Sequence, residues 1–170
     1  LELDMIWQPI TPLRLTLDYS YNDTRILKGD TFVDVNDNVN TGPVSIVGNS
    51  LPQAPKSKIA VNGSYSFFME PGTLTLSASY IYRDKAYANI FSKAWNEAPS
   101  WDQIDLRAHW APKGNKYTVI AYVKNVADTE GYDAAVVASN RNPGAFLNGG
   151  QNLELTPPRT YGVEFQYRFF

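Results

Sequence analysis

Hydrophobic and polar residues alternate along most of the chain, which is the pattern of extended strands with one apolar and one polar face. Residues 13–21 carry Leu or Tyr at every odd position and Arg, Thr, Asp or Ser at every even one. Residues 160–169 repeat the pattern, with Tyr161, Val163, Phe165, Tyr167 and Phe169 on the apolar side. Similar runs cover residues 1–7, 58–67, 74–83, 104–110 and 117–123, although Ile120 and Tyr122 blur the last of these. The pattern predicts about seven strands.

The connections between these strands alternate in length. Short turns are predicted at Pro9 to Pro12, Glu70 to Gly72 and Pro112 to Lys116. Long loops rich in Asn, Asp, Gly and Pro are predicted from about Ile26 to Lys56, with room for a short hairpin, from Ala88 to Pro99, and from Asp128 to Pro158. All short turns then lie at one end of an antiparallel up-and-down meander, and all long loops lie at the other.

Three architectures share this alternation. A transmembrane β-barrel exposes the apolar face to lipid, a soluble β-sandwich that binds a ligand buries it against a second sheet, and a small outer-membrane porin or enzyme barrel closes on itself with an even number of strands. No apolar run approaches the roughly 18 residues of a membrane helix, so only strands could cross a bilayer. The strict separation of short turns from long loops favours an outer-membrane barrel.

Composition sharpens this interpretation. Aromatic residues make up 14% of the chain, including eleven tyrosines, and they collect at strand ends, as expected for aromatic girdles at two membrane surfaces. One predicted girdle contains Trp7, Phe67 and Trp110, and the other contains Tyr19, Tyr21, Tyr80 and Tyr82. A formal net charge of −2 and the absence of cysteine argue against nucleic acid as a partner and against disulfides or cysteine-based metal sites.

No catalytic, cofactor or metal site is predicted. Asp105, Arg107 and the sole histidine, His109, share the polar face of one strand, where such residues usually form an ionic ladder along the inner wall of a barrel. Asp34, Asn36, Asp37 and Asn38 lack the glycine and the distal glutamate of a calcium loop. We therefore do not expect an enzyme.

The long loops carry the candidate ligand contacts. Trp and Tyr stack on sugar or aryl faces, while Asn and Arg supply directional hydrogen bonds. The candidates are Tyr87, Phe91, Trp95, Trp101, Tyr132, Asn140, Arg141, Asn142 and Phe146. The alternative is that these residues only pack the loops against one another.

Several segments resemble the C-terminal barrel region of TonB-dependent outer-membrane receptors, and together they span nearly the whole chain. Leu51 to Lys58 resembles the Pro-x-Ala-Pro segment that leads into a late strand, and Val123 to Asp128 resembles the Asn-Leu-Phe-Asp element of the family. The tyrosine that follows this element matches Tyr132, displaced by about one residue, and Pro157 to Gly162 resembles the entry to the last strand.

The resemblance implies that Val163, Phe165, Tyr167 and Phe169 or Phe170 form the terminal signal read by the barrel-assembly machinery. It also implies a large barrel with an N-terminal plug, so residues 1–170 are expected to be the C-terminal portion of such a barrel, a fragment that does not close by itself. The implied function is active uptake of a scarce nutrient, such as a siderophore, vitamin or oligosaccharide, across the bacterial outer membrane. The implied partners are outer-membrane lipid, the small-molecule or oligosaccharide substrate, and the TonB complex acting through the missing N-terminal region.

Overall fold

The computed structural model describes residues 1–37, 42–138 and 150–169. Its main element is a seven-stranded sheet in which every neighbouring pair is antiparallel. The strands, in their order across the sheet, are β1 (Glu2–Ile10), β2 (Leu13–Tyr21), β5 (Ser57–Met69), β6 (Gly72–Arg83), β9 (Trp101–Pro112), β10 (Tyr117–Lys124) and β13 (Thr160–Tyr167). The predicted all-β meander is confirmed, and no helix among the described residues is long and apolar enough to cross a bilayer.

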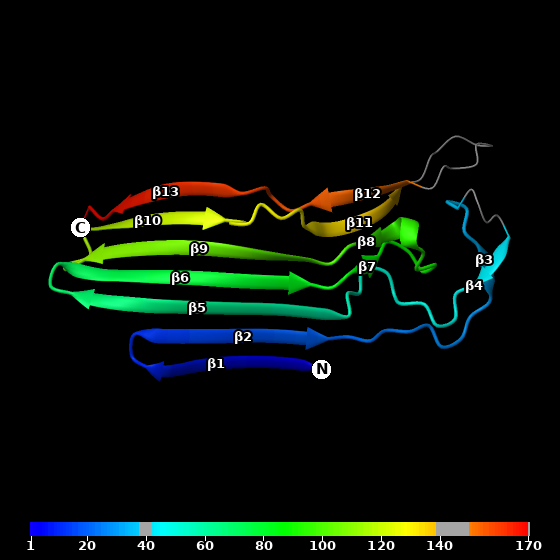
Figure 1. The fold of residues 1–170 in the computed structure, drawn as a ribbon, viewed down its shortest axis with the longest axis horizontal. Helices are drawn as coiled ribbons and strands as arrows, with labels where there is room; N and C mark the ends of the chain where they lie inside the picture. The colour runs from blue at the N-terminus through cyan, green and yellow to red at the C-terminus, as the bar shows by residue number, and fades with distance from the viewer. Residues whose placement is uncertain (38–41, 139–149, 170) are drawn as a thin grey trace.

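The sheet is open. Strands β1 and β13 form its two outer edges and do not pair with each other in the described part of the chain (Figure 1). A small closed barrel made from these strands alone would need that pairing. The chain therefore forms a section of wall and does not close by itself.

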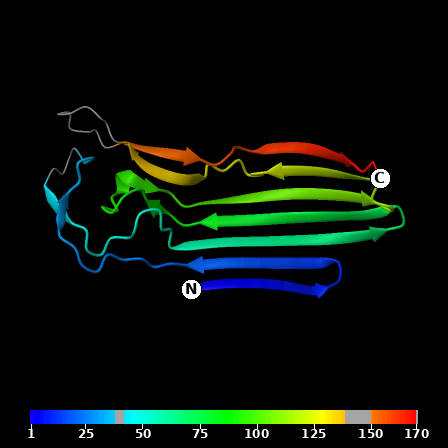
Figure 2. The ribbon, with the colours of Figure 1, turned by 180° about the vertical axis from the view of Figure 1, so that it is seen from behind.

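Three small hairpins fill the long connections, and all of them lie at the same end of the sheet (Figures 1 and 2). They are β3 (Thr31–Val33) with β4 (Pro43–Ser45), β7 (Ala86–Tyr87) with β8 (Glu97–Ala98), and β11 (Tyr132–Ala138) with β12 (Gly150–Leu155). A single 3₁₀ turn, η1 (Ala94–Asn96), precedes β8. We call this end the rim, and its first, second and third connections are those that join β2 to β5, β6 to β9 and β10 to β13.

The structure corrects three predicted boundaries. The segment from Asp128 to Pro158 was predicted as a long loop, but it contains the β11–β12 hairpin. Trp101 is the first residue of β9 and not part of a loop. Strand β1 continues to Ile10, through an irregularity in its pairing between Trp7 and Ile10, which accommodates Pro9 because proline cannot donate a ladder hydrogen bond.

The strand register sorts the side chains onto two faces. One row of paired residues runs from Leu15 through Gly63, Ala78, Leu106 and Val123 to Tyr161. The adjacent row runs from Arg14 through Ser64, Ser77, Arg107 and Tyr122 to Gly162. Successive residues of a strand point to opposite faces, so the first row belongs to an apolar face and the second to a polar face. Tyr122 and Ile120 thus lie on the polar face.

Nothing in the described part of the chain covers the apolar face. Val163 is 74% exposed and Phe165 is 63% exposed, whereas a sandwich would bury both against a second large sheet. Ring pairs stabilise this face near the short turns, with centroids 4.8 Å apart for Tyr65 and Phe67 and 5.7 Å apart for Tyr117 and Phe165. The fold is a single amphipathic sheet and not a sandwich.

Candidate functional site

The rim is the candidate functional site because its three long connections are fastened to one another. Gln53, in the first connection, donates its backbone N–H to the Tyr87 carbonyl at 2.9 Å and its side-chain amide to the Ala135 carbonyl. The Asn49 amide donates to the Ile90 carbonyl at 2.9 Å. Gln53 has a φ of 55°, in the left-handed region, so the chain turns sharply where it joins the other two connections. These hydrogen bonds therefore join all three long connections of the rim to one another.

An ion-pair cluster links the first and second connections. The Lys93 ammonium contacts Asp37 and lies 3.9 Å from Oδ2 of Asp34, whose side chain is fully buried. It also sits 5.9 Å from the centre of the Phe91 ring. Buried carboxylates require a partner charge, and Lys93 supplies it from the neighbouring connection. The predicted loop residue Phe91 thus packs beneath an interloop salt bridge.

Buried polar atoms without a hydrogen-bond partner concentrate at the same junction. In the described part of the chain they are Asp34 Oδ2, Asn36 Oδ1, Ser92 Oγ, Trp95 Nε1 and Asn96 Oδ1. Buried polar groups normally find partners in protein or ordered water. The junction between the first two connections is therefore rich in buried polar groups, and the indole N–H of Trp95 is one of them.

Tyr87 lies beside an ion pair in the β7–β8 hairpin. It lies in β7, with the Lys85 ammonium 5.7 Å from its ring centre, and the same ammonium contacts Glu97 Oε2 at 2.9 Å. The hydrogen bond that the Lys85 ammonium donates to Glu97 is the main cause of a raised pKa for Lys85, followed by the electrostatic interaction with Tyr87. Lys85 therefore stays charged and ties β7 to β8.

Trp101 and Tyr132 come together, as part of the scaffold of the rim. The Trp101 indole N–H donates to the Tyr132 backbone carbonyl at 2.9 Å. Arg83 Nη1 approaches the same carbonyl at 3.4 Å and donates to the Asp133 carbonyl at 2.5 Å. The polar atom of Trp101 is thus already engaged. The remaining candidates Asn140, Arg141, Asn142 and Phe146 lie outside the described residues.

Asn125 is the residue whose role the sequence interpretation missed. It is 1% exposed, has a φ of 53°, and its side chain bonds the backbone N–H and carbonyl of Thr129 at 2.9 Å each and the Pro157 carbonyl at 3.2 Å. Asp128 accepts the Arg159 N–H at 2.8 Å. The two motifs at 123–128 and 157–162 therefore bind each other and fasten the base of the β11–β12 hairpin. Their joint presence in the sequence was the available signal.

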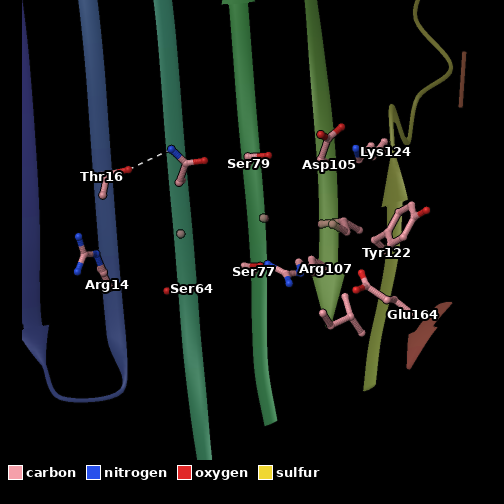
Figure 3. A pocket seen from close by; sticks show the side chains of 15 residues that line it. Arg14, Thr16, Ser64, Ser77, Ser79, Asp105, Arg107, Tyr122, Lys124 and Glu164 are labelled. Carbon is pink, nitrogen blue, oxygen red and sulfur yellow. Dashed lines mark hydrogen bonds between the residues drawn. The ribbon is translucent and has the colours of Figure 1, made fainter. Parts of the chain in front are cut away.

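A second candidate surface is a hollow of about 560 Å³ on the polar face (Figure 3). Arg14, Arg107 and Lys124 line it together with Asp105 and Glu164. Asp105 accepts hydrogen bonds from the Gln103 amide and the Asn125 backbone N–H, both at 2.8 Å. Within the described ranges no group of three or more His, Cys, Asp or Glu side chains could hold a metal ion.

The proposed assembly-signal residues lie at the free edge of the sheet. Val163, Phe165 and Tyr167 belong to β13 on the apolar face, and Phe169 follows the strand with its ring 5.1 Å from that of Tyr167. Phe169 is 84% exposed. Phe170 lies outside the described residues.

Comparison with solved structures identifies receptors with the same fold. The siderophore receptor PiuA from Acinetobacter baumannii superposes with a TM-score of 0.72 at 17% identity, over 96% of this chain and 20% of PiuA. BauA, the ferric preacinetobactin receptor of the same organism, gives 0.68 at 22% identity, over 98% and 21% of the two chains. The ferric yersiniabactin uptake receptor FyuA from Yersinia pestis gives 0.69 at 14%, over 99% and 23%.

The chain therefore spans about a fifth of the length of these receptors. No match is found among curated proteins. The sequence profile described as TonB dependent receptor-like, beta-barrel matches residues 1–126. The chain belongs to this family of TonB-dependent receptor-like β-barrels.

Proposed function

We propose that residues 1–170 are the C-terminal portion of the barrel of an outer-membrane receptor that takes up a scarce nutrient with energy from TonB. The observation that carries the proposal is the open sheet, with one exposed apolar face and all long connections at the rim. In this arrangement the apolar face meets lipid, the polar face lines the lumen, and the rim faces the outside of the cell.

Ferric siderophores are the first substrate class to test, with vitamins and oligosaccharides as the other members of the proposal. PiuA, BauA and FyuA, the three solved receptors compared above, are named for siderophores or ferric siderophores. The half-buried rim aromatics Tyr87, Phe91 and Trp95 offer ring faces to the aryl groups of such chelates. The remaining energy-coupling parts, a plug and its contact with TonB, belong to the proposed whole receptor.

The test is uptake by the full-length receptor in a bacterial strain that lacks its own siderophore receptors. Ferric catecholate, hydroxamate and mixed-ligand chelates are supplied with radioactive iron, and labelled cobalamin and maltooligosaccharides are supplied in parallel. We expect TonB-dependent accumulation of one class and none in an isogenic strain without TonB. TonB-independent accumulation, or no accumulation of any class, would contradict the proposal.

The assembly signal has its own test. Phe169→Asp places a charge on the apolar face at the edge of the sheet, whereas Arg168→Asp changes a polar-face position next to it. We expect Phe169→Asp to lower the amount of folded receptor in the outer membrane several-fold and Arg168→Asp to have little effect, as measured by heat-modifiable mobility on gels. Equal losses from both would remove Phe169 from the proposed signal.

A further inference from the structure

The β11–β12 hairpin is held to the rim through its backbone. Trp101 donates to the carbonyl of Tyr132, Arg83 to the carbonyls of Tyr132 and Asp133, and Gln53 to the carbonyl of Ala135. These donors come from the start of β9, the end of β6 and the first long connection. Because every bond ends on a backbone oxygen, the attachment does not depend on which side chains β11 carries.

Close packing supports the same attachment. A Cβ at Gly131 would lie 2.9 Å from Cδ2 of Trp101 and 2.6 Å from Oγ1 of Thr156, so only glycine permits this approach. The Gly131 carbonyl accepts the N–H of Thr156 at 2.9 Å, which joins the segments flanking the two strands of the hairpin. Ala135 is 1% exposed. The base of the hairpin is thus fixed on both sides.

The anchors also form part of a hollow. Arg83 and Trp101 are directly paired across β6 and β9, and together with Asp133 they line a space of about 530 Å³ at the rim end of the polar face. Asp133 belongs to the hairpin, whereas Lys58 and Asp18 on the opposite side belong to the sheet. The position of the hairpin therefore sets one side of this hollow.

We propose that Gln53, Arg83 and Trp101 are positioning residues for ligand capture, which hold the β11–β12 hairpin beside this hollow and thereby set the affinity of the receptor for its ligand. The inference rests on the proposed function for its ligand and on the hydrogen bonds above for its mechanism. Trp101, which the sequence predicted as a ligand contact, then acts by holding the hairpin through the Tyr132 carbonyl.

The first measurement needs no ligand. Trp101→Phe keeps the ring and removes the N–H, Arg83→Gln removes the guanidinium, and the double variant removes both donors to Tyr132. In the full-length receptor we expect hydrogen–deuterium exchange of the amides of residues 132–136 and 152–155 to accelerate about fivefold for each bond removed. Gln8→Ala is the matched control, because it removes an amide-to-carbonyl bond, to Thr11 at 3.1 Å, at the opposite end of the sheet.

The second measurement distinguishes a change in the position of the β11–β12 hairpin from a loss of folded receptor. Uptake of the radioactive ferric catecholate, hydroxamate and mixed-ligand chelates is measured over a range of concentrations for each variant. We expect the double variant to raise the apparent KM about tenfold at an unchanged maximal rate per folded receptor. Unchanged hairpin exchange, or faster exchange with an unchanged KM, would overturn the inference. If the parent receptor transports none of these chelates, the proposed siderophore substrate fails, and the anchoring role is decided by the exchange result alone.

Discussion

Gly72 is the residue at which the sheet tolerates a side chain least. It begins β6 directly after the turn from β5, opposite Pro112 in β9. A Cβ at this position would lie 2.4 Å from the Ala111 carbonyl oxygen and 2.7 Å from Cα of Pro112. Both are backbone atoms, so the neighbouring strand would have to move.

Replacement of Gly72 by alanine is therefore expected to destabilise the folded receptor by about 2 kcal/mol or more. The measurement is thermal unfolding of the full-length receptor in detergent. Gly63→Ala is the control, because its Cβ would meet only Cδ2 of Leu15, at 3.2 Å, and a flexible leucine can give way. Equal losses for the two variants would contradict the close approach at Gly72.

Asn125 combines a left-handed backbone with a buried side chain that makes hydrogen bonds to Thr129 and Pro157. Asn125→Ala removes three hydrogen bonds, each contributing about 1 kcal/mol, so we expect a loss of about 3 kcal/mol. Asn115→Ala measures the backbone contribution separately, because Asn115 is exposed and has a similar φ of 50°. If both variants lose the same stability in thermal unfolding, the side-chain bonds of Asn125 contribute nothing.

Among the elements, the rim depends on contacts between connections that are distant in sequence. The Lys93 ammonium reaches across from the η1 connection to Asp34 and Asp37 in the first connection. Asp34 is fully buried there, and the Lys93 side chain is only 21% exposed. Removing one partner of a buried pair leaves an uncompensated charge, which costs more than the pair itself contributes.

Lys93→Met is accordingly expected to lower the free energy of local unfolding of the rim by about 2 kcal/mol. It should also increase the rate at which a protease cleaves within the first connection. Adding Asp34→Asn and Asp37→Asn to Lys93→Met should restore most of the protection, because the unpaired charges are gone. Lys113→Met is the control, since the Lys113 ammonium lies 3.9 Å from Glu70 in an exposed pair that contributes little. Failure of the triple variant to regain protection would argue against the ion pair as the cause.

The strands of the sheet were predictable from sequence because a period of two residues is a local signal. The run 13–21 matches β2 in full, and the register of β10 with its neighbours settles the side on which Tyr122 lies. Strand β11 was not predictable. Its sequence Tyr-Asp-Ala-Ala-Val-Val-Ala lacks alternation, and side chains from remote elements bind its backbone.

The candidate site was predictable only as a location. The long connections that carry Tyr87, Phe91, Trp95 and Tyr132 lie at the rim, as the turn lengths implied. The anchoring role of Trp101 was not visible in the sequence, because its hydrogen bond joins residues 31 positions apart. The motif at 123–128 pointed to Asn125 in the sequence, but nothing in the sequence identified Pro157 as one of its hydrogen-bond partners.

At the scale of the whole chain, the main feature is an open, two-faced sheet whose outer edges at β1 and β13 are unpaired in the described residues. Large exposed apolar surfaces and free strand edges are liabilities in water. Both are resolved if further strands of the receptor continue the wall and lipid covers the apolar face. We therefore expect adjacent residues of one strand to face lipid and the lumen in turn.

The most direct test labels single cysteines at two adjacent pairs of positions, Arg14 with Leu15 and Leu106 with Arg107, in the full-length receptor reconstituted into liposomes. The chain has no native cysteine, and any elsewhere in the receptor are replaced by serine. With an environment-sensitive fluorophore attached, positions 15 and 106 should be quenched by spin-labelled lipid and positions 14 and 107 by aqueous iodide. Equal quenching at adjacent positions, or the reverse pattern, would contradict the account.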